Sequence, residues 1–351
     1  WFGVAHFEYL RGNQKKSYDA LKHANAADPN SAQLLFMLLQ MAFANNQPEE
    51  AYQYALKLSE VAPDKSAELI RRLGAVLVER QQDIPAAIRL YEQAAKSPKI
   101  NKESSLYVFL MKELGKLYVQ TKRIPEAATC YETLFDAIQN HDKYKLSSRD
   151  RRELQNDPTA AADVLAEVFL EAGKYPLARK AFENAATGRK SATGALHYNL
   201  ARVELKQQAP DQALVQLDQY FASDFTLKGR SPLELLAVIL KELKKEGELV
   251  SRLEGYLKLK PEEAVLMIFL AEQYVKAERL NDAEGLFKKV LEGENDPLAF
   301  IGLAQVSRRL NKIPEFLDNL AEAYGRKSNM DLFAGEMEAI SNDPKLWEGL
   351  W

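Results

Sequence analysis

The sequence predicts an all-α fold built from repeated pairs of antiparallel helices. Good helix formers, namely Ala, Leu, Lys, Glu and Gln, dominate its 351 residues. Only 16 Gly and 14 Pro occur, which leaves little room for the many turns of a β-sheet protein. A pattern of small and large apolar residues also returns about every 34 residues, as expected for a helical repeat.

Length and composition restrict the class of protein further. A single hydrophobic core rarely grows beyond ~250–300 residues, so 351 residues indicate several domains or a repeat array. The content of 46% hydrophobic and 28% charged residues is typical of a folded soluble protein. The net charge of −3 argues against a general nucleic-acid binder, which would carry a basic excess.

Cysteine content and hydropathy bear on the environment of the chain. Cys130 is the only cysteine, which excludes an intrachain disulfide and a cysteine-based zinc site but leaves cytoplasm and periplasm both open. No apolar run approaches the ~18–20 residues that span a bilayer, so we expect no direct membrane insertion. Because the sequence begins with Trp1, we expect a fragment or processed form, and any signal peptide or anchor would lie upstream.

The repeat is clearest in the second helix of each unit. Most copies place a small residue first, a larger apolar or aromatic residue four positions later, and a third apolar residue three positions after that. This spacing puts all three on one helix face. The first positions are Ser17, Ala51, Ala87, Ala127, Ala178, Ala213, Leu249, Ala283 and Phe316.

The first helix of each unit carries its own small residue. A small side chain lets two helices approach closely, and a large residue three positions later, as in Gly115 with Tyr118, fills the neighbouring groove. The second unit departs from this pattern with Leu39. The small residues are Ala5, Gly74, Gly115, Ala166, Ala201, Ala237, Ala271 and Ala304.

This pattern resembles the tetratricopeptide repeat (TPR), a 34-residue helix–turn–helix unit, over about nine units. The best-preserved copy is residues 114–134, LGKLYVQTKRIPEAATCYETL. The resemblance implies a right-handed superhelical solenoid over residues 1–327, whose hydrophobic core runs along the array. Residues 328–351 do not continue the repeat. The apolar stripe of Met330, Phe333, Met337 and Ile340, spaced 3, 4 and 3, predicts a capping helix followed by a tail.

Two stretches interrupt the period. The longest gap separates Ala127 from Ala178 and contains roughly 17 residues more than one 34-residue period. We place the insertion near residues 139–158 and predict a short helix that starts near Ser147 or Ser148. A solvated spacer is favoured over a functional arm. A smaller excess lies at residues 98–104.

No motif for catalysis or metal binding is present. The four histidines contain no pair at the i, i+4 spacing of a helical zinc site, and no phosphate-binding glycine loop or nucleophile elbow occurs. We therefore predict no enzyme activity, no metal site and no cofactor. Cys130 is interpreted as a small buried hydrophobe.

Binding residues are implied by the resemblance, because first helices of such repeats line the concave groove. The sharpest candidate is Asn199, since an Asn at this position hydrogen-bonds the ligand backbone in peptide-binding members. Arg202 and Lys206 could hold a carboxylate beside it. A clamp for chaperone tails is disfavoured, because only one such Asn occurs. The predicted groove residues are Tyr9, Phe36, Gln40, Phe43, Arg71, Arg72, Lys112, Lys116, Tyr198, Asn199, Arg202 and Lys206.

The sequence thus predicts a non-enzymatic scaffold that binds another protein, with a peptide or a partner's helix in the groove. One alternative is a scaffold subunit of a bacterial envelope or polysaccharide-export assembly, where such repeat proteins are common. A second is the regulatory region of a larger enzyme. The sequence assigns no partner and no oligomeric state.

Overall fold

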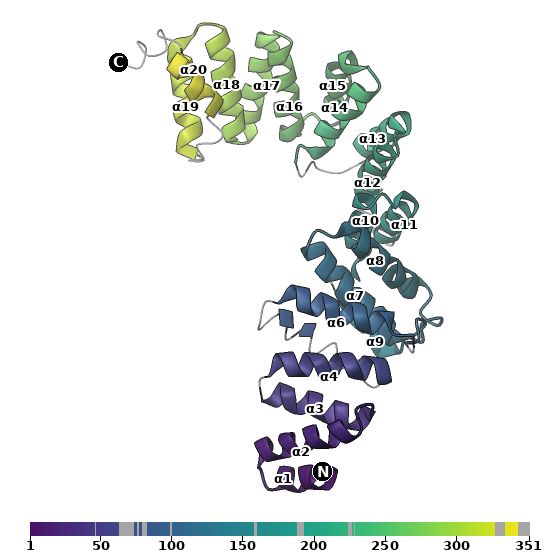
Figure 1. The fold of residues 1–351 in the computed structure, drawn as a ribbon. Helices are drawn as coiled ribbons and strands as arrows, with labels where there is room; N and C mark the ends of the chain where they lie inside the picture. Colours follow the sequence, from purple (N-terminus) through teal and green to yellow (C-terminus); the bar gives the residue numbers. More distant parts are fainter. Residues whose placement is uncertain are drawn as a thin grey trace. The chain divides into compact units, whose positions relative to one another are not determined.

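The chain folds into pairs of helices that pack in sequence order (Figure 1). The computed structural model describes residues 1–45, 47–62, 74–75, 77–78, 83–98, 100–157, 160–187, 193–223, 227, 229–326 and 334–342. Within these ranges every regular element is helical and no strand occurs. This confirms the predicted all-α fold of antiparallel helix pairs. Two compact units, Trp1–Ala185 and Ala186–Trp351, make up the chain.

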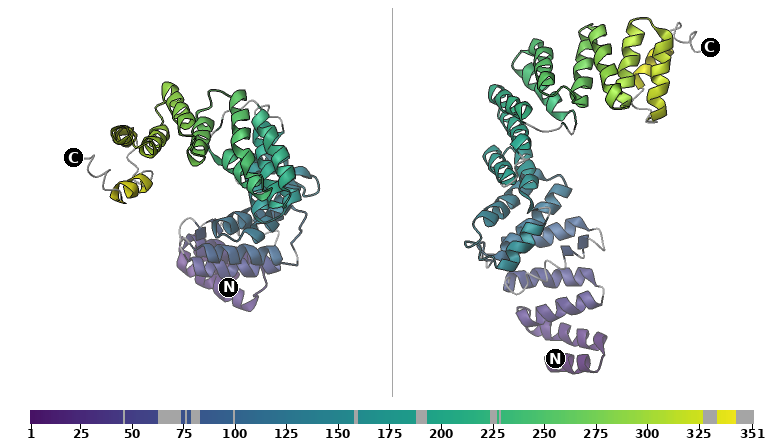
Figure 2. Two further views of the ribbon diagram at one scale, coloured as in Figure 1. Left: turned by 90° about the horizontal axis from the view of Figure 1, so that it is seen from above. Right: turned by 180° about the vertical axis from the view of Figure 1, so that it is seen from behind.

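The first unit holds α1 to α11, of which only the last residue, Ala186, falls in the second unit, and Figure 2 shows its successive helices stacked in order from the N-terminus. Its described helices are α1 (Phe2–Leu10), α2 (Gln14–Ala27), α3 (Ala32–Ala44), α4 (Pro48–Val61), α6 (Ile84–Lys96), α7 (Ser105–Gln120), α8 (Ile124–Gln139), α9 (Ser148–Asn156), α10 (Ala162–Glu171) and α11 (Tyr175–Ala186).

The second unit repeats the same arrangement. Its described helices are α12 (Thr193–Lys206), α13 (Pro210–Ala222), α14 (Ser231–Glu242), α15 (Leu249–Leu259), α16 (Ala264–Lys276), α17 (Leu280–Gly293), α18 (Pro297–Arg309), α19 (Ile313–Arg326) and α20 (Ala334–Asn342), with a 3₁₀ turn at Glu246–Glu248. One continuous cluster of buried apolar side chains joins α12 to α18.

The predicted second-helix positions form the contacts between helices. Those occupied by alanine are fully buried: Ala51, Ala87, Ala127, Ala178, Ala213 and Ala283. Ser17 and Phe316 are buried too, whereas Leu249 is only half-buried. Leu249 is the first residue of α15 and follows the 3₁₀ turn, so it lies at the end of its helix instead of within it.

Among the described residues, a left-handed residue ends the first helix in seven of the helix pairs. These residues have φ between +56° and +76°, and they are Gly12, Lys122, Gly173, Gln208, Lys244, Glu278 and Asn311. In each turn two backbone bonds close back onto the helix. At Lys122, for example, its own N–H reaches the Val119 carbonyl at 3.0 Å and the Arg123 N–H reaches the Tyr118 carbonyl at 2.8 Å. This is the Schellman pattern, which satisfies the last carbonyls of the first helix.

The second helix of the pair starts immediately after this turn. Arg123, the residue that closes the turn, is also the N-cap of α8. Proline lies in the first turn of α4, α6, α8 and α13, where its missing N–H has no intrahelical partner to lose. One short segment therefore both ends one helix and begins the next.

The insertion of the first unit is folded. Helix α9 begins at Ser148, where the sequence predicted a short helix. The Ser147 hydroxyl accepts from the Asp150 N–H at 3.2 Å, and the Asp150 carboxylate accepts from the Ser147 N–H at 2.8 Å. This capping box fixes the start of α9. Tyr144, Leu146 and Leu154 are buried, so the insertion packs against the repeats.

At the C-terminus, α20 packs on the last repeat. Its Ile340 is buried in a small cluster with Ala304 of α18 and Phe316 of α19. The other members of the predicted apolar stripe, Met330, Phe333 and the Met337 side chain, lie outside the described residues, as do Trp347 and Trp351.

We expect Gly173→Ala to lower the free energy of unfolding. The φ of Gly173 is +74°, a conformation that costs an L-residue with a Cβ about 1–2 kcal/mol. The reverse change, Gln208→Gly at φ +61°, should be neutral or stabilising. Urea unfolding followed by circular dichroism measures both. Equal destabilisation by the two changes would contradict this account of the turns.

Gly115→Ala should destabilise the fold by overpacking. A Cβ at Gly115 would lie 2.2 Å from the Cε1 of Tyr131, whose ring is fully buried. Overpacking of this kind costs about 1–3 kcal/mol. Gly285→Ala on α17 is the control, because nothing lies within 4 Å of a Cβ there. That change should stabilise the helix by up to about 1 kcal/mol, and a matching loss at both glycines would refute the packing argument.

Candidate functional site

Three of the predicted groove residues lie together on α12. Tyr198, Asn199 and Arg202 are each half-buried, and Lys206 at the end of the helix is exposed. An Arg202 Nη1–H donates to the Asn199 amide oxygen at 3.2 Å. The Arg202 guanidinium also lies 5.8 Å from the centre of the Tyr198 ring. We call Tyr198, Asn199 and Arg202 the α12 cluster.

Helix α13 packs against the residues of the α12 cluster. The Tyr198 ring lies 5.7 Å from the ring of Tyr220, which packs in turn against Phe221 at 5.1 Å. Burial raises the pKa of the Tyr220 hydroxyl, and the nearby Tyr198 and Glu263 add to this effect. His197 is held by Gln216 of α13, with 2.9 Å between Nδ1 and Oε1. The cluster therefore stands on a packed aromatic base.

The chemistry of the α12 cluster suits a polar ligand. An Asn side chain can donate and accept, and a guanidinium offers five N–H donors. Within the described residues, the Asn199 amide nitrogen makes no hydrogen bond, while its oxygen is oriented by Arg202. A peptide carbonyl or a carboxylate is the group that such donors bind.

The predicted basic residues of the first unit do not share one environment. Lys112 is buried, and its ammonium pairs with Asp157 at 2.6 Å and with Glu113 at 3.2 Å. Burial disfavours its charged form, but the hydrogen bond to Asp157 and the two carboxylates outweigh this, so the pKa of Lys112 is raised. Lys116 is exposed. Arg71 and Arg72 lie outside the described residues.

Lys112 was expected to line the binding groove, but in the structure its ammonium group pairs with carboxylates of the same chain. Asp157 belongs to the turn after α9, so Lys112 ties the insertion to α7. Its charge is already neutralised inside the chain.

The predicted aromatic residues of the first two helix pairs are spread over two helices. Tyr9 on α1 is 60% exposed, next to exposed Phe7 and Leu10. Phe36 on α3 is half-buried and Gln40 is exposed. Phe43 belongs to α3, but its side chain lies outside the described residues.

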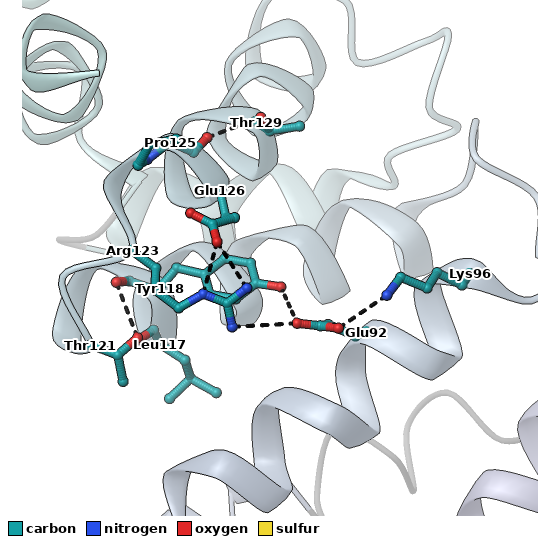
Figure 3. Close-up of polar contacts among 9 residues, drawn as sticks. All are labelled: Glu92, Lys96, Leu117, Tyr118, Thr121, Arg123, Pro125, Glu126 and Thr129. Atoms are coloured by element: carbon teal, nitrogen blue, oxygen red, sulfur yellow. Dashed lines mark hydrogen bonds and ion pairs between the residues drawn. The ribbon is translucent and has the colours of Figure 1, made fainter.

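A polar cluster between repeats was not predicted from the sequence. Figure 3 shows the Glu92 carboxylate of α6 between the Tyr118 hydroxyl and Arg123 on one side and Lys96 on the other. The Tyr118 hydroxyl donates to Glu92 at 2.7 Å, and Arg123 lies 3.6 Å from the same carboxylate. The Arg123 guanidinium also lies 4.4 Å from the centre of the Tyr118 ring. The hydrogen bond from Tyr118, supported by Lys96 and Arg123, lowers the pKa of Glu92.

The same cluster recurs in the second unit. The Tyr274 hydroxyl donates to Glu254 at 2.7 Å, and Arg279 reaches that carboxylate at 2.9 Å. In both copies the arginine follows the tyrosine by five residues, and the glutamate comes from the preceding second helix. This spacing is the signal that could have revealed the clusters, and their position between repeats gives them a structural role.

The insertion forms a pocket that sequence reasoning also missed. It lies among α8, α9, α10 and α11 and has a volume of about 310 Å³. Apolar side chains including Phe135, Leu146, Leu154 and Leu165 line it, together with Arg151 and a few other polar residues. The sequence did contain an indication of this pocket, because Leu146 and Leu154 are apolar residues in a mostly polar insertion.

The remaining reactive groups have structural explanations. Burial raises the pKa of the Cys130 thiol to about 12, which keeps it protonated and unreactive. Among the residues that the structure describes, no group of His, Cys, Asp and Glu side chains could hold a metal ion. In the same part of the chain, no helix has the length and apolar content needed to cross a membrane.

Comparison with known proteins detects a known repeat in part of the sequence. Residues 164–224 match the family model of the tetratricopeptide repeat. A search of curated proteins finds no match to the sequence. Similar solved structures include yeast Tom70, which is 12% identical with a TM-score of 0.41, with 99% of this chain and 91% of that chain covered.

Two further structures show the same kind of similarity. A tetratricopeptide repeat protein from Parabacteroides merdae ATCC 43184 is 16% identical, with a TM-score of 0.32 and coverage of 79% of this chain and 98% of that one. The APC/C hetero-tetramer Cut9-Hcn1 is 14% identical, with a TM-score of 0.34 and coverage of 99% and 83%. All three TM-scores are low, so these structures carry no argument about family or function.

We expect Tyr118→Phe to lower the free energy of unfolding by about 1 kcal/mol at pH 7, because the variant loses a hydrogen bond to Glu92. The folded pKa of Glu92 lies below its ordinary value of 4.5. Its stabilising contribution is therefore complete above pH 4.5 and is lost as the pH falls through the lowered value. The difference between wild type and variant should shrink at acid pH.

Urea unfolding at pH 7 and at a series of pH values that decrease from 4.5 measures this difference. Tyr9→Phe serves as the control, because Tyr9 is exposed and its hydroxyl makes no bond within the described residues. A gap between wild type and Tyr118→Phe that stays constant with pH would rule out Glu92 as the partner that matters.

Proposed function

We propose that this chain, a tetratricopeptide-repeat protein, is a non-enzymatic scaffold that binds another protein through the first helices of its repeats. The single observation that carries the proposal is the α12 cluster. There a polar amide, a guanidinium and an aromatic ring share one side of a helix on a rigid base.

The α12 cluster suits an extended peptide or the end of a partner's helix. Asn199 can bond a backbone amide of the ligand, while Arg202 attracts a carbonyl or carboxylate beside it. Tyr198 offers an aromatic face that is already ordered, so little side-chain entropy is lost on binding. A preformed site of this kind favours a specific partner over general adhesion.

Each unit also has an exposed lysine on a first helix that is a candidate for partner contact. Lys206 lies one helical turn beyond Arg202, and Lys116 is exposed on α7 of the first unit. Phe36, Gln40 and Tyr9 remain candidates for partner contact at the N-terminal end. Lys112 is not included, because Asp157 and Glu113 already pair with it.

The proposal involves no catalysis and no nucleic acid. Among the described residues, the groups with large pKa shifts include several buried tyrosines, Cys130 and Arg279, and each shift is explained by burial or by a bond to a neighbouring side chain. The net charge of −3 gives no general attraction for a polyanion.

The test is affinity capture of partners with the full chain, followed by quantitative mass spectrometry. The double variant Asn199→Ala plus Arg202→Ala should lower the enrichment of a specific partner at least tenfold. The matched control is Gln212→Ala plus Gln219→Ala, two exposed residues on α13 of the same helix pair. Circular dichroism confirms that each variant stays folded.

The control variant should retain the same partners as the wild type. Equal capture of every partner by the wild type and by the α12 double variant would overturn the role of this cluster.

A further inference from the structure

We propose that the pocket made by the insertion is a ligand site for an apolar group that carries a carboxylate. This site is separate from the α12 cluster and does not depend on the function proposed above. It lies within the first unit, where α9 packs beside α8 and α10.

The floor of the pocket is apolar and comes from α8, α9, α10 and the loop before α9. Phe135 belongs to α8, Leu154 to α9 and Leu165 to α10, and all three are buried. Leu146 from the loop completes the floor. Binding is favourable when an apolar group displaces water from an apolar cavity that is open to solvent.

Polar donors surround this floor. Arg151 of α9 is half-buried at the pocket, and Gln155 of α9 and Asn184 of α11 line it as well. Within the described part of the chain, the Arg151 side chain bonds only to the Ser148 hydroxyl, at 3.2 Å, and has no carboxylate partner. A guanidinium at the edge of an apolar pocket is complementary to an anionic group on an apolar ligand.

Two other basic residues near the insertion already form ion pairs. Lys143 pairs with Asp136 at 2.7 Å, and Lys112 pairs with Asp157. Arg152 lies on the same helix and donates to the Ser148 carbonyl at 3.3 Å. Arg151 is thus the cation that lines the pocket and lacks an ion pair among the described residues.

The pocket is preformed by a polar framework outside it. Asp136 accepts from the Tyr144 hydroxyl at 2.8 Å and from the Asn140 amide at 2.6 Å, which holds the loop before α9. The Ser147 capping box holds the start of α9, and the Lys112–Asp157 pair holds the turn after it. A ligand therefore meets walls that need no ordering on binding.

The volume limits the ligand. About 310 Å³ is at the lower end of the ~300–1,000 Å³ range of small-molecule pockets. The apolar body and the carboxylate must therefore be close together, as in a short aromatic or aliphatic acid. A peptide that ends in a large apolar residue presents the same two groups.

The test titrates the full chain with 4-phenylbutanoate, followed by calorimetry and by ligand-observed NMR. We expect saturable binding that weakens at least tenfold in Arg151→Gln, and no binding of 4-phenylbutylamine, which has the same apolar body and the opposite charge. Arg149→Gln is the matched control, because Arg149 is exposed on α9 and does not line the pocket. It should bind like the wild type.

A second arm distinguishes the two sources of this chemistry. It compares 4-phenylbutanoate with an acetylated tetrapeptide that ends in phenylalanine, as the free acid and as the amide. Tighter binding of the peptide acid identifies a protein terminus as the ligand, and tighter binding of the free acid identifies a small organic acid. Circular dichroism and urea unfolding establish that Arg151→Gln is folded. Absence of saturable binding by either acid, or equal binding to folded Arg151→Gln and wild type, overturns the proposal.

Discussion

The left-handed turn between paired helices is the constraint on which the architecture depends. One residue at positive φ lets the chain reverse direction while two backbone bonds satisfy the last carbonyls of the first helix. The residue that closes the turn at Lys122 is Arg123, which caps the next helix and contacts Glu92 of the preceding repeat. Turn geometry and stacking between repeats are therefore coupled through single residues.

The fold could be predicted from sequence because packing between repeats has a fixed spacing. Alanines such as Ala127 and Ala213 are fully buried where the pattern placed them, since a small side chain lets two helices approach closely. The turns were harder to predict. Lys122, Gln208 and Glu278 adopt positive φ although none of them favours it, because tertiary structure outweighs the local preference of one residue. The hydroxyl bonds of Tyr118 and Tyr274 were also missed, since apolar periodicity describes their rings alone.

The candidate sites were only partly predictable for a related reason. Tyr198, Asn199 and Arg202 lie on one helix, so their proximity follows from helical spacing. Lys112 occupies an equivalent kind of position, but its environment is set by Asp157, which lies 45 residues away. The insertion pocket depends on four helices and a loop. A contact between distant segments has no signature in a repeat pattern, which reports only what all units share.

Departures from the repeat are where this chain can acquire a specific function. A residue that every unit requires, such as the buried Ala127, is explained by packing and gives no information about ligands. The insertion adds side chains that no packing rule of the repeat demands, and it is tied down by Lys112, Asp136 and Ser147 instead of being left as a loose loop. Ordering these residues costs conformational entropy, which the burial of Tyr144, Leu146 and Leu154 offsets. Arg151 takes part in none of those stabilising contacts beyond one bond to Ser148 on its own helix, so folding alone does not explain a cation at that position.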